Sequence, residues 1–273
     1  MRKSALSASL LAFVLFIGFV QPSEVRAQSA SPVIDRILKK GTLTVGTAGN
    51  MPPLNMTTKS GNVIGIEADI AKWMAQAMGV KLQLETMPFA QLLQALKKGK
   101  VDLVMSGMTI TPDRNLRVAF VGPYMVSGKC FLSKQDEIAR AQDPSQIPQR
   151  DITVAALKGS TSQAFVEIAL PKAKLIATAD YDEGVDLVLK GKVDAMVADY
   201  PLCMVSMVRY PDAGFSSLFT RLTYEPLGIA LPPNDTLLMN WVENLMHTLE
   251  ASGRLEALNK RWMESGWWLA ELP

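Results

Sequence analysis

The sequence has 273 residues, with 28 lysines and arginines against 26 aspartates and glutamates. This near balance of charge lacks the basic footprint that nucleic-acid binding requires. A single histidine and two cysteines also argue against a metal site, so we expect neither a metal nor a cofactor.

The first 27 residues have the three parts of a signal peptide. Arg2 and Lys3 form a positive start, residues 5–20 are almost wholly apolar, and Val25 and Ala27 stand at the two positions that define a cleavage site. We predict cleavage after Ala27 and secretion of a soluble chain. An uncleaved anchor is the alternative, but about 16 apolar residues fall short of the roughly 20 that span a bilayer. Without this segment, which holds three basic residues and one acidic residue, 25 of each remain.

Strand and helix patterns alternate in the first half of the remaining chain. Thr42–Val45 is a short β-prone run, and Ile66–Met78 repeats apolar residues at helical spacing before a glycine. Lys81–Glu85 alternates as a strand does. Pro88 opens a helix that Gly99 closes, and a buried-strand pattern follows. The apolar face of that helix is Phe89, Leu92, Leu93 and Leu96, and the strand is Val101–Met105.

The second half repeats this scheme, which predicts an α/β fold with mainly parallel sheets. Residues 96–104 and 189–197 share one order: a helix end, a glycine, then an apolar strand. Two similar lobes would explain this repeat, although such joints are common enough to recur by chance. Ser160 and Gln163 form a capping-box pattern at a helix start. The predicted strands are Ile152–Leu157 and Val193–Val197, and the predicted helices are one from Ser160, Asp182–Leu189, Tyr200–Val208 and Leu237–Trp262, the last broken near Ser252-Gly253.

Cys130 and Cys203 leave two possibilities open. A secreted protein can join them in a disulfide, but free cysteines are also often buried as small apolar side chains. The single histidine, His247, lies in an amphipathic segment with no catalytic partner in its context, so serine or cysteine catalysis is not expected.

Polar residues follow the predicted strands, where open α/β sheets bind ligands. The loop of residues 106–114 follows the strand at 101–105 and ends at Arg114, whose guanidinium can hold a carboxylate through two parallel hydrogen bonds. Thr109 could complete that grip. The alternative is an exposed arginine at a helix start.

Two further strand ends carry candidate ligand groups. Ser160 and Thr161 stand at a helix N-terminus that favours an anion, unless Ser160 is an ordinary cap. Asp199 could pair with a ligand ammonium group, or it could be the N-cap of the next helix. Together with Arg114 these groups fit both ends of a zwitterion, which indicates a free α-amino acid.

The chain resembles the family 3 extracellular solute-binding proteins, the polar amino acid branch of bacterial ABC uptake systems, from about Ile34 to Trp267. The resemblance implies a two-lobed α/β Venus flytrap fold with two crossing strands, near Tyr124–Cys130 and Tyr224–Ile229. We expect a signal peptide at 1–27, lobe 1 at 28–125 and 228–273, and lobe 2 at 126–227. The matching segments are residues 41–47, 65–71, 107–114, 118–124, 159–161, 191–195 and 225–230.

The resemblance also implies roles for individual residues. Arg114 would bind the ligand α-carboxylate and Asp199 its α-ammonium group. Members that take basic amino acids carry an Asp and an aromatic residue where this chain has Ala48 and Met51. With Leu54 and Phe89 nearby, this more apolar pocket predicts a neutral or apolar amino acid. The remaining residues implied to line the ligand are Ser106, Gly107, Thr109, Ser160 and Thr161.

The expected function is therefore periplasmic capture of a small amino acid by a monomer that delivers it to an ABC permease in the inner membrane. It involves no catalytic residue. One alternative is a secreted cyclohexadienyl dehydratase, since those enzymes are similar in fold; such an enzyme needs a carboxylic acid, for which Glu225 is the candidate. Another is delivery of the ligand to a sensor. The sequence does not distinguish a permease from a sensor as the recipient.

Overall fold

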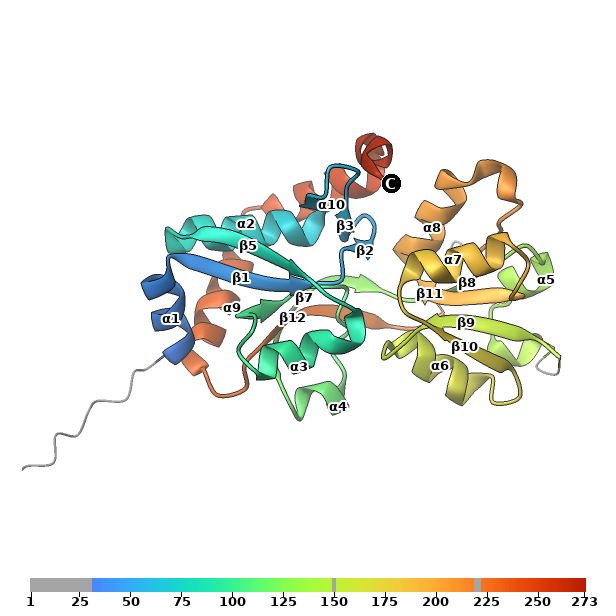
Figure 1. The fold of residues 1–273 in the computed structure, drawn as a ribbon, viewed down its shortest axis with the longest axis horizontal. Coiled ribbons are helices and arrows are strands. Elements are labelled where there is room, and N and C mark those ends of the chain that lie inside the picture. The colour runs from blue at the N-terminus through green and yellow to red at the C-terminus, as the bar shows by residue number, and fades with distance from the viewer. Residues whose placement is uncertain (1–30, 149–150, 219–221) are drawn as a thin grey trace, which may run out of the picture.

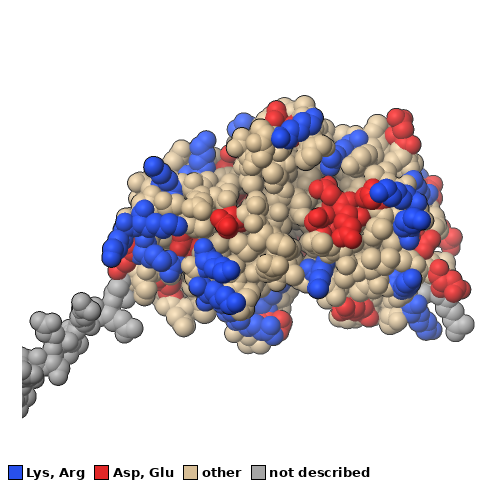
Figure 2. Space-filling view, viewed as in Figure 1, with Lys and Arg blue, Asp and Glu red and all other residues tan. Residues whose placement is uncertain are grey.

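A computed structural model describes residues 31–148, 151–218 and 222–273. The chain forms two lobes side by side, each built on one sheet with helices packed on it (Figure 1). The predicted signal peptide lies outside the described residues. Within the three described ranges, every helix is too short or too polar to cross a membrane. Figure 2 shows basic and acidic side chains interspersed on the face in view, as the balanced composition would suggest.

Lobe 1 contains a five-stranded sheet in the order β5-β1-β6-β12-β7. β1 runs parallel to β5 and β6, whereas β12 is antiparallel to β6 and β7. The late strand β12 therefore returns the chain to the lobe in which it began. The strands are β1 (Thr42–Thr47), β5 (Lys81–Thr86), β6 (Leu103–Val104), β7 (Ala119–Ser127) and β12 (Glu225–Leu231), with a small separate sheet of β2 (Asn50–Met51), β3 (Asn55–Thr57) and β4 (Val63–Ile64).

Helices cover the sheet of lobe 1 because their apolar faces pack into its core. α2 (Ile66–Met78) has the predicted bounds, buries Ile70 and Met74, and ends at Gly79, whose φ of 69° closes the helix. The C-terminal pattern is interrupted where predicted, by Gly253 with a φ of 70°. The other helices are α1 (Pro32–Lys40), η1 (Phe89–Gln91), α3 (Leu92–Lys97), α4 (Pro112–Asn115), α9 (Thr236–Ala251), α10 (Arg254–Glu264) and η4 (Trp267–Glu271).

Lobe 2 contains a four-stranded sheet in the order β10-β9-β11-β8. β9 is parallel to β10 and β11, and β8 is antiparallel to β11. The strands are β8 (Lys129–Ser133), β9 (Thr153–Leu157), β10 (Lys174–Thr178) and β11 (Ala195–Asp199). The helices are α5 (Asp136–Ala139), η2 (Pro144–Gln146), α6 (Thr161–Ala169), α7 (Tyr181–Leu189), α8 (Tyr200–Arg209) and η3 (Pro211–Ala213).

Two antiparallel strands lead from lobe 1 toward lobe 2. β7 and β12 pair along their length, with Glu225 opposite Ser127 at the end near lobe 2 and Leu231 opposite Ala119 at the far end (Figure 1). β8 of the second sheet starts only two residues after β7 ends. Both strands therefore reach the junction between the lobes side by side.

A disulfide joins Cys130 in β8 to Cys203 in α8, with 6.6 Å between their Cα atoms. Of the two possibilities that the sequence leaves open, the structure contains the bonded pair. The bond fastens helix α8 to the strand at the edge of its sheet.

Candidate functional site

Arg114 lies at the junction of the two lobes. Thr111 caps the short helix α4 by accepting a hydrogen bond from the Arg114 amide. This bond fixes the backbone from which the Arg114 side chain extends. It donates to the carbonyl oxygen of Thr109 in its own lobe at 2.8 Å and to that of Gly159 in lobe 2 at 3.2 Å. Arg114 is only 9% exposed, so the alternative of an exposed arginine is wrong.

The surroundings of Arg114 are both aromatic and acidic. The guanidinium lies over the ring of Phe89, 5.6 Å from its centroid. Burial lowers the pKa of Arg114 from its ordinary value, while the negative charges of Asp199 and Glu225 act in the opposite direction. The structure thus brings Phe89 and Asp199, both predicted from sequence, into the neighbourhood of Arg114.

Asp199 ends strand β11 and occupies the N-cap position of α8, yet its side chain makes no capping bond. Its carboxylate instead accepts from Lys129 Nζ at 3.0 Å and from the Tyr181 hydroxyl at 3.1 Å. Lys129 reaches it directly because the two residues are register partners in the β8–β11 pair. Asp199 is therefore the N-cap of α8 by position, while its carboxylate is held by Lys129 and Tyr181 of lobe 2 instead of capping the helix.

Glu225, at the start of β12, is the second carboxylate of the site. It lies 3.4 Å from Lys129 Nζ and accepts from the hydroxyls of Thr161 at 2.9 Å and Thr223 at 3.0 Å. Burial by itself would raise the pKa of Glu225, but Lys129 and the threonine donors bring it below its ordinary value. Glu225 is therefore ionised at neutral pH.

The Gly159-Ser160-Thr161 turn contributes its residues in different ways. Thr161 extends to Glu225 and lies 3.4 Å from the Thr109 hydroxyl of lobe 1. Ser160 caps α6, accepting from the backbone of Ser162 and Gln163. The capping box is incomplete, because Gln163 accepts from the Gly159 amide and not from Ser160. Ser160 thus follows the capping interpretation, while Thr161 belongs to the junction.

Ser106, Gly107 and Met51 form the layer next to this junction in lobe 1. The Ser106 hydroxyl accepts from the Ala48 amide at 2.8 Å. Gly107 has a φ of 58°, and a side chain there would collide with the sulfur of Met51. The position therefore needs glycine for both its backbone and its space. Met51 is fully buried under this turn.

A buried carboxylate that the sequence analysis did not single out supports the Gly107 turn. Glu67 of α2 accepts from the Gly107 amide at 2.7 Å, from Asn55 at 2.6 Å and from the Tyr124 hydroxyl. Burial raises the pKa of Glu67. It connects to the loop that ends at Arg114 through the backbone amide of Gly107.

Lys129 and Tyr181 are also absent from the residues that sequence analysis selected. Lys129 is followed in β8 by Cys-Phe-Leu. A lysine at the start of such an apolar strand is a pattern from which a buried charged residue could have been predicted. Tyr181 carries no comparable signal, since it reads as the first residue of an amphipathic helix.

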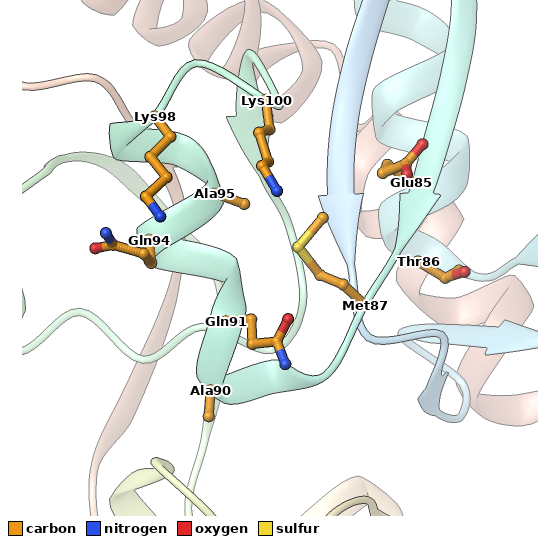
Figure 3. Close-up of a pocket in the computed structure, with 9 residues that line it drawn as sticks. All are labelled: Glu85, Thr86, Met87, Ala90, Gln91, Gln94, Ala95, Lys98 and Lys100. Atoms are coloured by element: carbon orange, nitrogen blue, oxygen red, sulfur yellow. The ribbon is translucent and has the colours of Figure 1, made fainter.

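The largest cavity among those found lies outside this site. It has about 550 Å³ and is walled by β5, η1 and α3 on lobe 1 (Figure 3). One of its lining residues, Ala90, lies next to Gly159 of lobe 2. Across the described part of the chain, histidine, cysteine, aspartate and glutamate form no group of three or more that could hold a metal ion.

Comparison with known proteins gives relatives of two kinds. Cyclohexadienyl dehydratase of Pseudomonas aeruginosa is 28% identical over 88% of this chain and 89% of that protein. The arginine-binding periplasmic protein of Mannheimia haemolytica is 26% identical over 78% of this chain and 87% of its own.

A solved binding component of an ABC transporter from Wolinella succinogenes, in complex with lysine, superposes with a TM-score of 0.79. It is 34% identical and covers 84% of this chain and 98% of its own. Residues 43–265 match the bacterial extracellular solute-binding proteins, family 3. With its two lobes and its charged interlobe junction, the chain belongs to family 3 of the bacterial extracellular solute-binding proteins.

Proposed function

We propose that the protein captures a small amino acid in the periplasm and delivers it, as a monomer, to an ABC permease in the inner membrane. The observation that carries this proposal is the placement of Arg114. Its guanidinium donates hydrogen bonds to Thr109 of lobe 1 and Gly159 of lobe 2, and it interacts electrostatically with Asp199 and Glu225. The arginine-binding and lysine-bound relatives support an amino acid as the ligand.

The groups at the junction complement both ends of an α-amino acid. Arg114 uses two of its five N–H donors on backbone carbonyls, which leaves donors for a carboxylate. Asp199 and Glu225 supply the negative charge for an ammonium group. Because these groups come from both lobes, a ligand bound between them would hold the lobes together.

Four uncharged side chains of lobe 1 support a neutral or apolar ligand side chain. They are Ala48, Met51, Leu54 and Phe89, at or near the positions where members that take basic amino acids carry an acidic and an aromatic residue. A basic ligand would find no carboxylate among these four residues. We therefore expect neutral amino acids to bind more tightly than lysine, arginine or histidine.

A screen of the standard amino acids tests this proposal. Protein unfolded and refolded to remove co-purified ligand would be heated with each amino acid, and hits confirmed by calorimetry. We expect one or a few neutral amino acids to raise the melting temperature, because a ligand that binds only the folded state stabilises it. If no amino acid raised it, the proposal would be wrong.

A dehydratase is the second candidate, favoured by the similarity to the enzyme of Pseudomonas aeruginosa. Loss of a hydroxyl group requires a proton donor, and a carboxyl serves only while it is protonated. Lys129 and the hydroxyls of Thr161 and Thr223 stabilise the carboxylate form of Glu225 and lower its pKa, which favours binding over proton donation. Incubation with prephenate and arogenate decides between them, since turnover of either one would establish the enzyme.

A further inference from the structure

Lys129 is an unusual residue for the inside of a protein lobe. It is the first residue of β8 and is 0% exposed, whereas lysine is among the residues least often buried completely. A buried ammonium group is tolerated only where opposite charge compensates it. Its position therefore has to be explained by its partners.

Its partners are the two carboxylates of the site. Nζ lies 3.0 Å from Asp199 and 3.4 Å from Glu225. The side chains of these two residues are 4% and 10% exposed, so water screens the three charges only weakly. Lys129 can neutralise one of the two carboxylates, and the second remains available to another cation.

Counting charge at the junction shows what Lys129 changes. Arg114 and Lys129 are positive, and Asp199 and Glu225 are negative, so the four groups sum to zero. Glu67 is outside this count because it lies in lobe 1 behind Gly107, where burial raises its pKa and so favours the uncharged carboxyl. Without Lys129 the group would carry a net negative charge and would suit a ligand with a net positive charge.

We infer that Lys129 sets the charge class of the ligand: by balancing the buried site it selects neutral zwitterionic amino acids against basic ones. This inference rests on the proposed capture of an amino acid. A neutral amino acid leaves the net charge of the site at zero. Its carboxylate pairs with Arg114, and its ammonium group pairs with whichever of Asp199 and Glu225 is not neutralised by Lys129. A basic amino acid would bring one uncompensated positive charge into the same site.

The same charge count disfavours a ligand without an amino group. Such a carboxylate would pair with Arg114, but nothing would then balance the second of the two acids. The total would be one negative charge in a buried site, with Glu225 ionised. This alternative becomes one of the outcomes of the test.

A cycle of charge-changing variants tests the inference directly. Lys129→Met removes the cation, Glu225→Gln removes one anion, and the double variant removes both and restores neutrality. Each protein would be titrated by calorimetry with lysine, glutamate and the neutral amino acid that the wild type binds best. Lys172→Met is the matched control, because Lys172 is an exposed lysine of the same lobe.

The variants are expected to shift the ligand preference in opposite directions. In Lys129→Met the affinity ratio of the neutral amino acid to lysine should fall by about a hundredfold or more, because one buried charge is no longer compensated. In Glu225→Gln the preference should move toward glutamate. The double variant and Lys172→Met should keep the preference for the neutral amino acid.

Several outcomes would overturn the inference. It is wrong if Lys129→Met keeps the wild-type ratio, or if the wild type binds lysine best. If the wild type binds only carboxylates without an amino group, or no amino acid at all, the proposed function falls and takes this inference with it. If Lys129→Met does not fold, Glu225→Gln and the double variant still differ by one charge, and equal preferences in those two would overturn it.

Discussion

At the scale of single residues, Arg114 is the group whose loss should affect binding most. Arg114→Ala would leave the ligand carboxylate buried without its partner, which costs roughly 3–5 kcal/mol. We expect the dissociation constant measured by calorimetry to rise by a factor of hundreds or more. Retention of near-wild-type affinity would contradict the assigned role.

Arg117→Ala is the matched control for this variant. Arg117 is exposed and forms an ion pair with Asp113 at 3.1 Å, which is itself exposed and contributes little. We expect its affinity for the same ligand to stay within about twofold of the wild type. Melting temperatures of both variants would show whether a loss of affinity reflects the site or the fold.

Residues at strand ends could be predicted because their position follows from chain order alone. Arg114 ends the loop that follows one predicted strand and Asp199 stands just after another, and the structure brings both to one junction. Lys129 could not be predicted in this way, since its pairing with Asp199 depends on the register of two strands 70 residues apart. For Ser160 the sequence allowed two roles, a helix cap or a ligand contact, and the structure shows the helix cap.

At the scale of elements, long helices could be predicted from the sequence and very short strands could not. α2, α8 and α9 each extend over several turns, so their apolar residues repeat often enough to be recognised. β2 and β4 have two residues each, too few for any alternation, and the predicted strand 101–105 shortens to Leu103–Val104. β2 and β4 form by pairing with the equally short β3 beside them in the chain, whereas β6 forms by pairing with β1, far from it in the sequence.

The disulfide between β8 and α8 should matter for the stability of lobe 2. It closes a loop with a sequence separation of 73 residues, so removing it frees the unfolded chain. We expect Cys130→Ala with Cys203→Ala to lower the free energy of unfolding by roughly 2–4 kcal/mol. Urea denaturation measures this change.

The reduced wild-type protein is the control for that variant. Treatment with a thiol reductant under the same conditions should lower its unfolding free energy by a similar amount, because both proteins lack the same cross-link. If the double variant were as stable as the oxidised wild type, the disulfide would not contribute to the stability of lobe 2.

At the scale of the whole molecule, the arrangement of the two lobes could be predicted but their contact could not. The repeat of helix end, glycine and strand indicated two lobes, and the family resemblance indicated two crossing strands. Two of the contacts between the lobes join Arg114 to Gly159 and Thr109 to Thr161. These residues are about 45–52 positions apart in the chain, and no periodicity relates them.

We expect the two lobes to be further apart in the ligand-free protein and to close on each other when the ligand binds. β7 and β12 connect them as one strand pair, and at the site Arg114, Thr109 and Glu225 form hydrogen bonds with residues of lobe 2. A ligand between Arg114 and Asp199 adds opposite charges from both lobes and so favours closure. Small-angle X-ray scattering of the ligand-free protein should give a larger radius of gyration than the saturated protein. An unchanged scattering curve on saturation would mean that binding does not close the lobes.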